Sequence, residues 1–470
     1  MSYIILFFGI VDSYLLVRIL EPGQQIIQAS MAALILLILG GIVWAKRKRK
    51  SDEKAVIGGI LLMGIVMRVG YMLYTGCDVR SHDLWEFNLE SGGHAGYLLT
   101  IILEGRLPET NFRQYYQQPF FYIVGGMVSR GINGLLKSDD WYYLVDAAKT
   151  VSCFASCACL LVLERICTIL EIEGKGKRTA LALTAFLPVF YLTGGRVNCD
   201  SLNALFILLA FLYTIRWSRE PSWKNVIILA FVYGFGMMNK ISCGVMAVFT
   251  AAVFIWMFWK ADRNWRDMLK KYLVFAFISF PLGLWYSVRN LLKFGQGLTY
   301  VLRIPETSEI YCGSYSIVQR FLSWDIGNLL KTPYADVWKD YNCPVYFIKS
   351  ALFGEFTYEI NDVIPVILLG SLVFLVLLLT AALICNIWKR RGKWELSAFC
   401  LIYISALLFA YQYPFGCSMD FRYLGAMGGL GALILGRYYN HAPRPWIRTA
   451  IDWNTAVFSL FSCLMFILIK

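Results

Sequence analysis

The chain has 470 residues, of which 58% are hydrophobic and only 16% are charged, and its mean hydropathy is +0.57. Because a soluble domain carries about 25% charged residues, this composition excludes an ordinary soluble protein. The formal net charge of +13 would indicate nucleic-acid binding in a soluble chain. Here the basic residues stand between apolar runs, so we expect a membrane protein that binds no nucleic acid.

Long apolar runs follow one another along the chain, and a run of about 18 residues or more is a candidate membrane-spanning helix. We expect about thirteen spans and therefore an all-α polytopic fold. Several runs are shorter than a full span, so their helices should extend into polar flanks or lie deep in the bundle. The spans are predicted near 3–20, 26–44, 55–74, 142–166, 179–192, 202–215, 226–238, 243–259, 273–285, 363–387, 398–411, 424–435 and 456–469.

Basic residues cluster in the loops on one side of these predicted spans, which the positive-inside rule assigns to the cytoplasm. The N-terminus is then expected inside and the C-terminus outside. The blocks fall within 46–50, 175–178, 216–224, 260–271, 389–393 and 437–448.

Two long segments are expected on the outer side, and loops of this length are usually functional. In the first, two amphipathic stretches at 95–103 and 120–132 could lie along the membrane surface. The predicted organisation has four parts, in chain order. They are two extra N-terminal spans with a basic cytoplasmic loop (1–54), a transmembrane module (55–290) that includes the first outer loop (76–141), a second outer loop (291–362) and C-terminal spans (363–470).

Polar and charged side chains gather at the outer ends of the predicted spans. A charge costs about 2.5–3.5 kcal/mol at the bilayer centre and less at a helix end, so each residue alone could be an interfacial anchor. The recurrence of carboxylates with cations on one face favours a site instead. The set comprises Asp78, Arg80, His82, Asp83, His94, Glu104, Arg113, Gln117 and Gln118 in the first loop, and Arg196, Asn198, Asp200, Asn239, Lys240, Arg289, Asn290, Asp420 and Arg422 at later helix ends.

This residue set indicates transfer of a group from a phosphate carrier. A hydroxyl or amine acceptor needs a base for its proton, and a carboxylate such as Asp83 can serve. A phosphate leaving group develops negative charge, which Arg and Lys stabilise. The surrounding hydrophobic bundle could hold the isoprenoid tail of a lipid carrier, and the first loop could position the acceptor. The cationic candidates are Arg196, Lys240, Arg289 and Arg422.

His82, Asp83 and His94 also offer the ligand types that bind zinc. They lack the i,i+4 spacing or any other fixed spacing of a metal motif. We therefore expect His82 to orient Asp83 or to tune its pKa. No resident metal is assigned, and a divalent metal stays open as an alternative.

Several segments together resemble the GT-C glycosyltransferases, with the protein O-mannosyltransferases and the lipid A aminoarabinose transferases as the nearest groups. The resemblance runs in order from about Asp78 to Gly429. Each motif alone is only moderately specific, and their order adds weight. The segments are CDVRSHDLWEF, GGHAGYLLTIILEGRLPE, QYYQQPFFYIVGG, GRVNCDSLNALF, MMNKISCG, WYSVRNLLKFGQ and MDFRYLGAMGGL.

The resemblance implies an inverting transferase with an extracytoplasmic site that uses a hexose or pentose carried on a polyprenyl or dolichyl phosphate. The essential first-loop acid of the family falls on Asp83 or, alternatively, on Asp78, and its second acid falls on Asp200. Its phosphate contacts would fall among the four cations named above. This chain departs from the pattern where Asp83 is followed by Leu84 rather than Glu, and where Gln117–Pro119 replaces a motif that often includes lysine. These departures leave the phosphate ligands and the donor open.

The acceptor is expected to be an extracytoplasmic protein, glycolipid or wall polymer, and the location a bacterial plasma membrane. Two other classes stay open. A secondary transporter or lipid flippase would explain why Pro188 and Pro281 interrupt predicted spans. A non-catalytic scaffold of envelope assembly would have no need of Asp83 beside basic and aromatic residues. The remaining candidate binding residues are His94, Arg113, Gln118, Asn198, Asn290 and Asp420.

Overall fold

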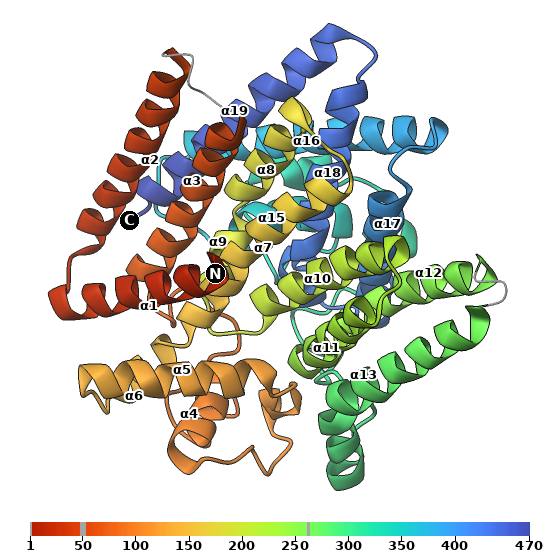
Figure 1. The fold of residues 1–470 in the computed structure, drawn as a ribbon. Helices are drawn as coiled ribbons and strands as arrows, with labels where there is room; N and C mark the ends of the chain where they lie inside the picture. The colour runs from red at the N-terminus through yellow and green to blue at the C-terminus, as the bar shows by residue number, and fades with distance from the viewer. Residues whose placement is uncertain (1, 48–52, 261–263) are drawn as a thin grey trace. The chain divides into compact units, whose positions relative to one another are not determined.

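The structure is a computed structural model that describes residues 2–47, 53–260 and 264–470. Over these ranges the chain forms helices and loops, together with one isolated antiparallel bridge between Tyr311 and Phe415 (Figure 1). The predicted all-α fold is therefore confirmed. Four residues of the predicted basic blocks lie outside the described ranges, namely Lys48, Arg49, Lys50 and Arg263.

Ten helices within the described ranges are long and apolar enough to cross a membrane, and each coincides with a predicted span. This supports the expectation of a multi-pass membrane protein. They are Ser2–Leu20, Gln24–Arg47, Glu53–Tyr74, Trp141–Ile169, Asp200–Arg219, Ile241–Lys260, Trp265–Phe294, Val363–Trp388, Lys393–Gln412 and Pro445–Leu468.

The other three predicted spans fall on shorter helices, so the count of thirteen is not confirmed. Helix α8 (Gly174–Phe186) has 13 residues, and α11 (Trp223–Asn239) and α18 (Gly425–His441) have 17 each. At 1.5 Å per residue, 17 residues span about 25 Å, which is less than the roughly 30 Å of a hydrocarbon core.

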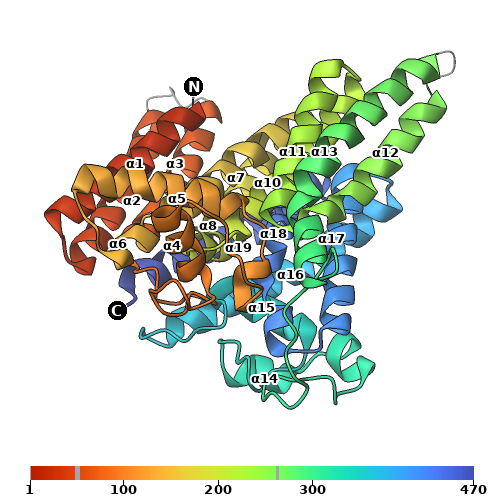
Figure 2. The same cartoon turned by 90° about the horizontal axis from the view of Figure 1, so that it is seen from below.

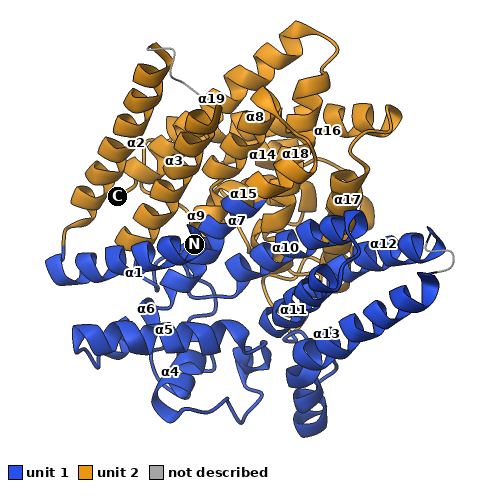
Figure 3. Cartoon of the chain, in the orientation of Figure 1, with its two compact units in different colours: residues 1–21, 75–162, 193–303 blue, residues 22–74, 163–192, 304–470 orange. Residues whose placement is uncertain are grey.

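The chain divides into two compact units, each assembled from three separate stretches (Figure 3). Unit 1 comprises residues 1–21, 75–162 and 193–303, and unit 2 comprises residues 22–74, 163–192 and 304–470. Each unit combines several of the segments defined from the sequence. Two helices, α7 (Lys149–Ile169) and α9 (Val189–Gly194), carry residues of both units.

Unit 1 contains the first outer loop and most of the candidate residues. Its helices α11 and α13 pack together and run side by side in both views (Figure 2). Pro281 lies inside α13 without ending it. Helix α13 comprises Trp265–Phe294. The other helices of unit 1 are α1 (Ser2–Leu20), α4 (His94–Glu104), η1 (Arg113–Tyr116), α5 (Phe120–Leu136), α6 (Trp141–Asp146), α10 (Asp200–Arg219), η2 (Ile241–Val245) and α12 (Met246–Lys260).

Unit 2 contains residues 304–362 of the second outer loop and the C-terminal helices. Its α8 packs closely against α18, where a Cβ added at Gly176 would lie 2.3 Å from the carbonyl oxygen of Gly436. The other helices of unit 2 are α2 (Gln24–Arg47), α3 (Glu53–Tyr74), η4 (Val318–Leu322), α14 (Ile326–Lys331), α15 (Cys343–Phe353), α16 (Val363–Trp388), α17 (Lys393–Gln412), η5 (Gly416–Met419), η6 (Phe421–Leu424) and α19 (Pro445–Leu468).

Pro188 interrupts the helical run as the sequence predicted. Helix α8 ends at Phe186, and Leu187 is extended, as the residue before a proline prefers to be. Buried Arg68 of α3 donates to the carbonyls of Thr184 and Ala185 at 2.9 and 2.8 Å. These carbonyls have no partner inside the helix, so the guanidinium supplies the hydrogen bonds that the break removes.

Candidate active site

The first outer loop of unit 1 holds an unusual backbone. Arg80, Asp83, Trp85 and Arg113 are non-glycine residues with positive φ angles of 52, 57, 59 and 45°. The left-handed region is sterically costly for a residue with a Cβ, and such strain tends to collect at functional sites. The backbone strain and the sequence motifs therefore both indicate the first outer loop as part of a functional site.

The two candidate acids of this loop differ in their partners. The Asp78 carboxylate accepts a hydrogen bond of 2.9 Å from the Tyr142 hydroxyl on α6. The side chain of half-buried Asp83 makes no hydrogen bond or ion pair with any residue that the structure describes, whereas its backbone carbonyl accepts from the amide of His94 at 2.9 Å. Asp78 is thus a candidate for anchoring the loop, and Asp83 offers an unoccupied carboxylate.

Tyr116 lies near the Asp83 carboxylate. Burial raises the pKa of the Tyr116 phenol, and the negative charge of Asp83 raises it further. A phenol that stays protonated in this way can donate a hydrogen bond to an anion. Sequence reasoning did not single out Tyr116, because a tyrosine among aromatic neighbours carries no signal of its own.

His94 begins a chain of hydrogen bonds that reaches the start of α10. Its Nδ1 lies 2.6 Å from the Tyr122 hydroxyl, which donates to the Gln117 side-chain oxygen at 3.1 Å. The Cys199 thiol donates to the same oxygen at 3.6 Å. His94 is 3% exposed, so it is a linking residue of the loop rather than an open contact surface.

Three predicted binding residues hold the first loop against the end of α13. Gln118 donates to the Ser287 hydroxyl at 2.8 Å, and Arg289 donates to the carbonyl of Pro108 at 2.7 Å. Asn290 donates to the carbonyl of Tyr116 at 3.4 Å. The structure therefore places these three residues against the first loop. Their side chains donate hydrogen bonds to other residues of the same chain.

Arg113 lies over the ring of Trp85, with its guanidinium carbon 4.0 Å from the ring centroid, and donates to the carbonyl of Ser91. Both Arg113 and Trp85 carry left-handed backbone. Attraction between the cation and the aromatic face helps to hold the two side chains together.

At the start of α10, Asp200 forms an ion pair of 2.5 Å with Lys240. The Asp200 side chain is 4% exposed and that of Lys240 is 24% exposed. The predicted second acid therefore neutralises one of the predicted phosphate ligands. Nearby, Arg196 is buried, and Asn198 caps the turn by accepting from the Asp200 amide at 3.1 Å.

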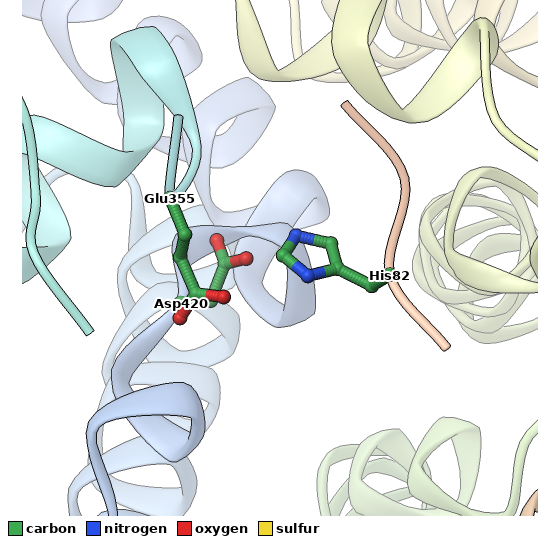
Figure 4. Close-up of side chains that lie close together, drawn as sticks. All are labelled: His82, Glu355 and Asp420. Atoms are coloured by element: carbon green, nitrogen blue, oxygen red, sulfur yellow. The ribbon is translucent and has the colours of Figure 1, made fainter. Parts of the chain in front are cut away.

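In unit 2, the buried Asp420 side chain contacts Arg422, with Nε and Oδ2 3.3 Å apart. A carboxylate oxygen of Glu355 lies within 4.8 Å of one of Asp420 (Figure 4), and Glu355 accepts from the Tyr346 hydroxyl. His82, which the figure also labels, belongs to unit 1. No sequence motif indicated Glu355, because this residue lies in the second outer loop outside every motif.

From the sequence, a metal site formed by His82, Asp83 and His94 was left open as an alternative. Within the described ranges, these three residues do not form a group of ligand atoms close enough to hold one ion. The hydrogen bond between His94 and Tyr122 also occupies one ring nitrogen. The metal alternative at these three residues therefore finds no support.

Ten membrane-length helices within the described ranges, together with a strained polar loop, define a polytopic α-helical membrane protein. Residues 147–286 match the family described as dolichyl-phosphate-mannose-protein mannosyltransferase. The predicted resemblance to membrane glycosyltransferases is thereby confirmed over this segment, which includes Arg196, Asp200 and Lys240. No curated protein sequence matches the chain.

The chain is also similar to proteins of known structure. One is the oligosaccharyltransferase AglB from Archaeoglobus fulgidus in complex with an inhibitory peptide and a dolichol-phosphate, with a TM-score of 0.48, 10% identity, and coverage of 87% of this chain and 55% of that one. The chain thus spans about half the length of that protein. Another is ArnT from Cupriavidus metallidurans in the apo state, with a TM-score of 0.37, 14% identity, and coverage of 82% and 80%.

Proposed function

We propose that this protein is a membrane glycosyltransferase that moves a sugar from a polyprenyl-phosphate carrier to an extracytoplasmic acceptor. The family match over residues 147–286 supports the transferase class. The observation that carries the proposal further is the Asp83 carboxylate, which has no hydrogen-bond or ion-pair partner among the described residues and lies on a strained loop.

In the proposed reaction, Asp83 removes the proton of an acceptor hydroxyl or amine as its oxygen or nitrogen attacks the anomeric carbon. The bond between this carbon and the phosphate oxygen breaks, and the electron pair leaves with the carrier phosphate. A single displacement of this kind inverts the anomeric centre. General base catalysis of this type contributes about 10²–10⁴-fold to the rate.

The leaving phosphate needs positive charge. The candidates in unit 1 are Arg196, Lys240 and Arg289. Lys240 and Arg289 would each exchange a present partner, Asp200 or the Pro108 carbonyl, for the phosphate. Arg422 of unit 2 pairs with Asp420 in the same manner. An acid that pairs with a cation before the donor binds keeps this cation in place for the phosphate. It also avoids the cost of burying an unpaired charge.

The test measures the amount of lipid-linked sugars by mass spectrometry. It compares cells that lack the protein with the same cells that express the unaltered protein or one of its variants. We expect a polyprenyl-phosphate sugar to accumulate without the protein and again with Asp83→Asn. Asp78→Asn keeps an oxygen that can accept from Tyr142, so it should largely prevent the accumulation. Exposed Asp139→Asn is the matched control and should behave as the unaltered protein.

Full complementation by Asp83→Asn would remove this residue as the base. If Asp78→Asn rather than Asp83→Asn caused the accumulation, the roles of the two acids would be exchanged. If no lipid-linked sugar accumulated in any strain, the transferase proposal itself would fail.

The transporter or flippase alternative was based on Pro188 and Pro281, which interrupt predicted spans, and Pro281 lies within the continuous helix α13. In unit 2 the carbonyls freed by Pro188 accept hydrogen bonds from Arg68, and that of Phe186 accepts from Ser462 at 2.6 Å. These groups are therefore occupied, and the break gives no specific reason to prefer transport.

A further inference from the structure

Helix α1 contributes to a buried charge cluster at the base of the first outer loop, and all residues of the cluster belong to unit 1. The Asp146 carboxylate, at the end of α6, accepts from the Tyr14 hydroxyl at 2.7 Å and from the Arg18 guanidinium. It also forms an ion pair of 2.7 Å with Lys149. The side chains of Asp146 and Lys149 are both fully buried.

The same cluster binds the backbone of the loop directly. The other Asp146 oxygen accepts from the amide of Cys77 at 2.9 Å, and Lys149 donates to the carbonyl of Thr75. The segment between α3 and the candidate acids is thus held at both a carbonyl and an amide. Groups of this kind are held firmly because a buried polar atom that loses its partner costs about 1–3 kcal/mol.

Further hydrogen bonds connect α6 to the segment that carries the candidate acids. One turn before Asp146, Tyr142 donates to the Asp78 carboxylate, and Ser81 donates to the Asp78 carbonyl at 3.3 Å. Asp83 follows two residues after Ser81. Whatever fixes α6 therefore fixes the first part of the loop that carries Asp83.

Arg18 is the second cation that pairs with Asp146, beside Lys149. Its side chain is 23% exposed, and its guanidinium carbon lies 4.8 Å from the centroid of the Tyr143 ring on α6. Helix α1 also packs against α5, and Phe7 meets Phe154 edge to face at 5.5 Å between centroids. The extra N-terminal helix, to which the sequence assigned no role, is therefore attached to the loop by specific polar contacts and by packing.

We propose that α1 is a positioning helix, whose Tyr14 and Arg18 act through Asp146 to hold the backbone at 75–78 and thereby set the place of Asp83. The catalytic consequence rests on the proposed transferase function, whereas the structural link does not. Tyr14 and Arg18 touch no reacting atom in this scheme, so they are positioning residues.

The test uses hydrogen exchange with mass spectrometry on the full-length detergent-solubilised protein, because exchange reports the loop independently of activity. In Arg18→Met, which keeps an unbranched apolar stem but removes the guanidinium and its charge, we expect exchange in the peptide covering 75–83 to accelerate about tenfold. Tyr14→Phe removes one hydroxyl and should accelerate it less. Asp12→Asn, an exposed charge change on the same helix, should leave exchange unchanged.

Steady-state kinetics provide the second readout. Arg18→Met should lower kcat for sugar transfer by roughly tenfold and leave the donor KM unchanged, since the donor contacts remain and only the base is displaced. Arg18→Lys should restore part of kcat, because a cation at this place can still pair with Asp146, whereas the stacking of the guanidinium on Tyr143 is lost. A purely structural role would not produce this division between kcat and KM.

Unchanged exchange at 75–83 in both Arg18→Met and Tyr14→Phe would overturn the proposal. Acceleration spread evenly over the whole chain would also overturn it, because α1 would then act on global stability. If Arg18→Met does not fold, Tyr14→Phe decides. If the unaltered protein transfers no sugar, the proposed function fails, while local acceleration at 75–83 would still support the link between α1 and the loop.

Discussion

The ion pair between Asp200 and Lys240 combines a predicted acid with a predicted phosphate ligand. Asp200 is nearly buried and Lys240 is partly exposed. Removal of one partner from a fully buried pair costs roughly 3–5 kcal/mol, and partial exposure of Lys240 should reduce that cost. The pair can therefore serve both the fold and the site, and the two roles need separate measurements.

For stability, Asp200→Asn and Lys240→Met should each lower the Tm in detergent. The double variant should recover part of the loss, because neither charge is then left alone. A thermal-unfolding double-mutant cycle measures this coupling. Strictly additive losses would show that the pair contributes nothing to folding.

For donor use, Lys240→Ala should raise the donor KM by about tenfold if its ammonium contacts the carrier phosphate, a loss that corresponds to about 1.4 kcal/mol. Lys224→Ala, an exposed lysine at the opposite end of α11, is the matched control. Kinetics with purified lipid-linked donor measure both variants. An unaltered KM in Lys240→Ala would place the phosphate elsewhere.

Among the helices, the break between α8 and α9 shows how an apolar run can end inside unit 2. Arg68 is fully buried and supplies hydrogen bonds to Thr184 and Ala185, while Tyr191 adds a second donor to Ala185 at 3.0 Å. The guanidinium also lies over the rings of Phe190 and Tyr191, which follow the break. A buried arginine in α3 thus has a structural explanation within the helix bundle.

Arg68→Met should destabilise the protein by at least about 2 kcal/mol, because the Thr184 carbonyl loses its donor and an unsatisfied buried group costs about 1–3 kcal/mol. Thermal unfolding in detergent measures the loss. Arg130→Met, an exposed arginine on α5, controls for removal of charge. Equal Tm values for the two variants would show that the break does not depend on Arg68.

The contact of α8 with α18 depends on two glycines that face each other. A Cβ at Gly436 would lie 2.5 Å from the carbonyl oxygen of Gly176, and backbone cannot easily move away. We expect Gly436→Ala to cost roughly 1–3 kcal/mol, the usual range for overpacking. Gly131→Ala on α5, where no atom lies within 4 Å, should stabilise by about 0.5–1 kcal/mol in the same unfolding measurement, because Ala favours the helix. A Gly436→Ala variant as stable as Gly131→Ala would mean that the helices can separate at no cost.

For the molecule as a whole, the distribution of basic loops predicts the orientation in the membrane. An alkaline phosphatase fusion after Gly93, in the first outer loop, should be active because this enzyme requires an extracytoplasmic environment. A fusion after Arg391, in a basic loop, should be inactive. The reverse pattern would place the proposed site on the cytoplasmic side.

Composition and the length of the apolar runs determined the helical, membrane-spanning class, because burial of apolar side chains in lipid requires long runs that are visible in the sequence itself. The motif order also led to the resemblance that the match over residues 147–286 supports. Apolar runs and motifs are local or additive along the chain, so the sequence alone is sufficient to recognise them.

Only the tertiary structure decided which polar groups are already paired. Asp78 and Asp83 look alike in the sequence, yet Tyr142 reaches only Asp78, from 64 positions away. Lys240 pairs with Asp200, and Arg18 pairs with Asp146 from 128 positions away. A hydrogen bond forms only where folding brings two atoms within about 3 Å of each other. The spacing of residues along the chain does not predict such long-range contacts.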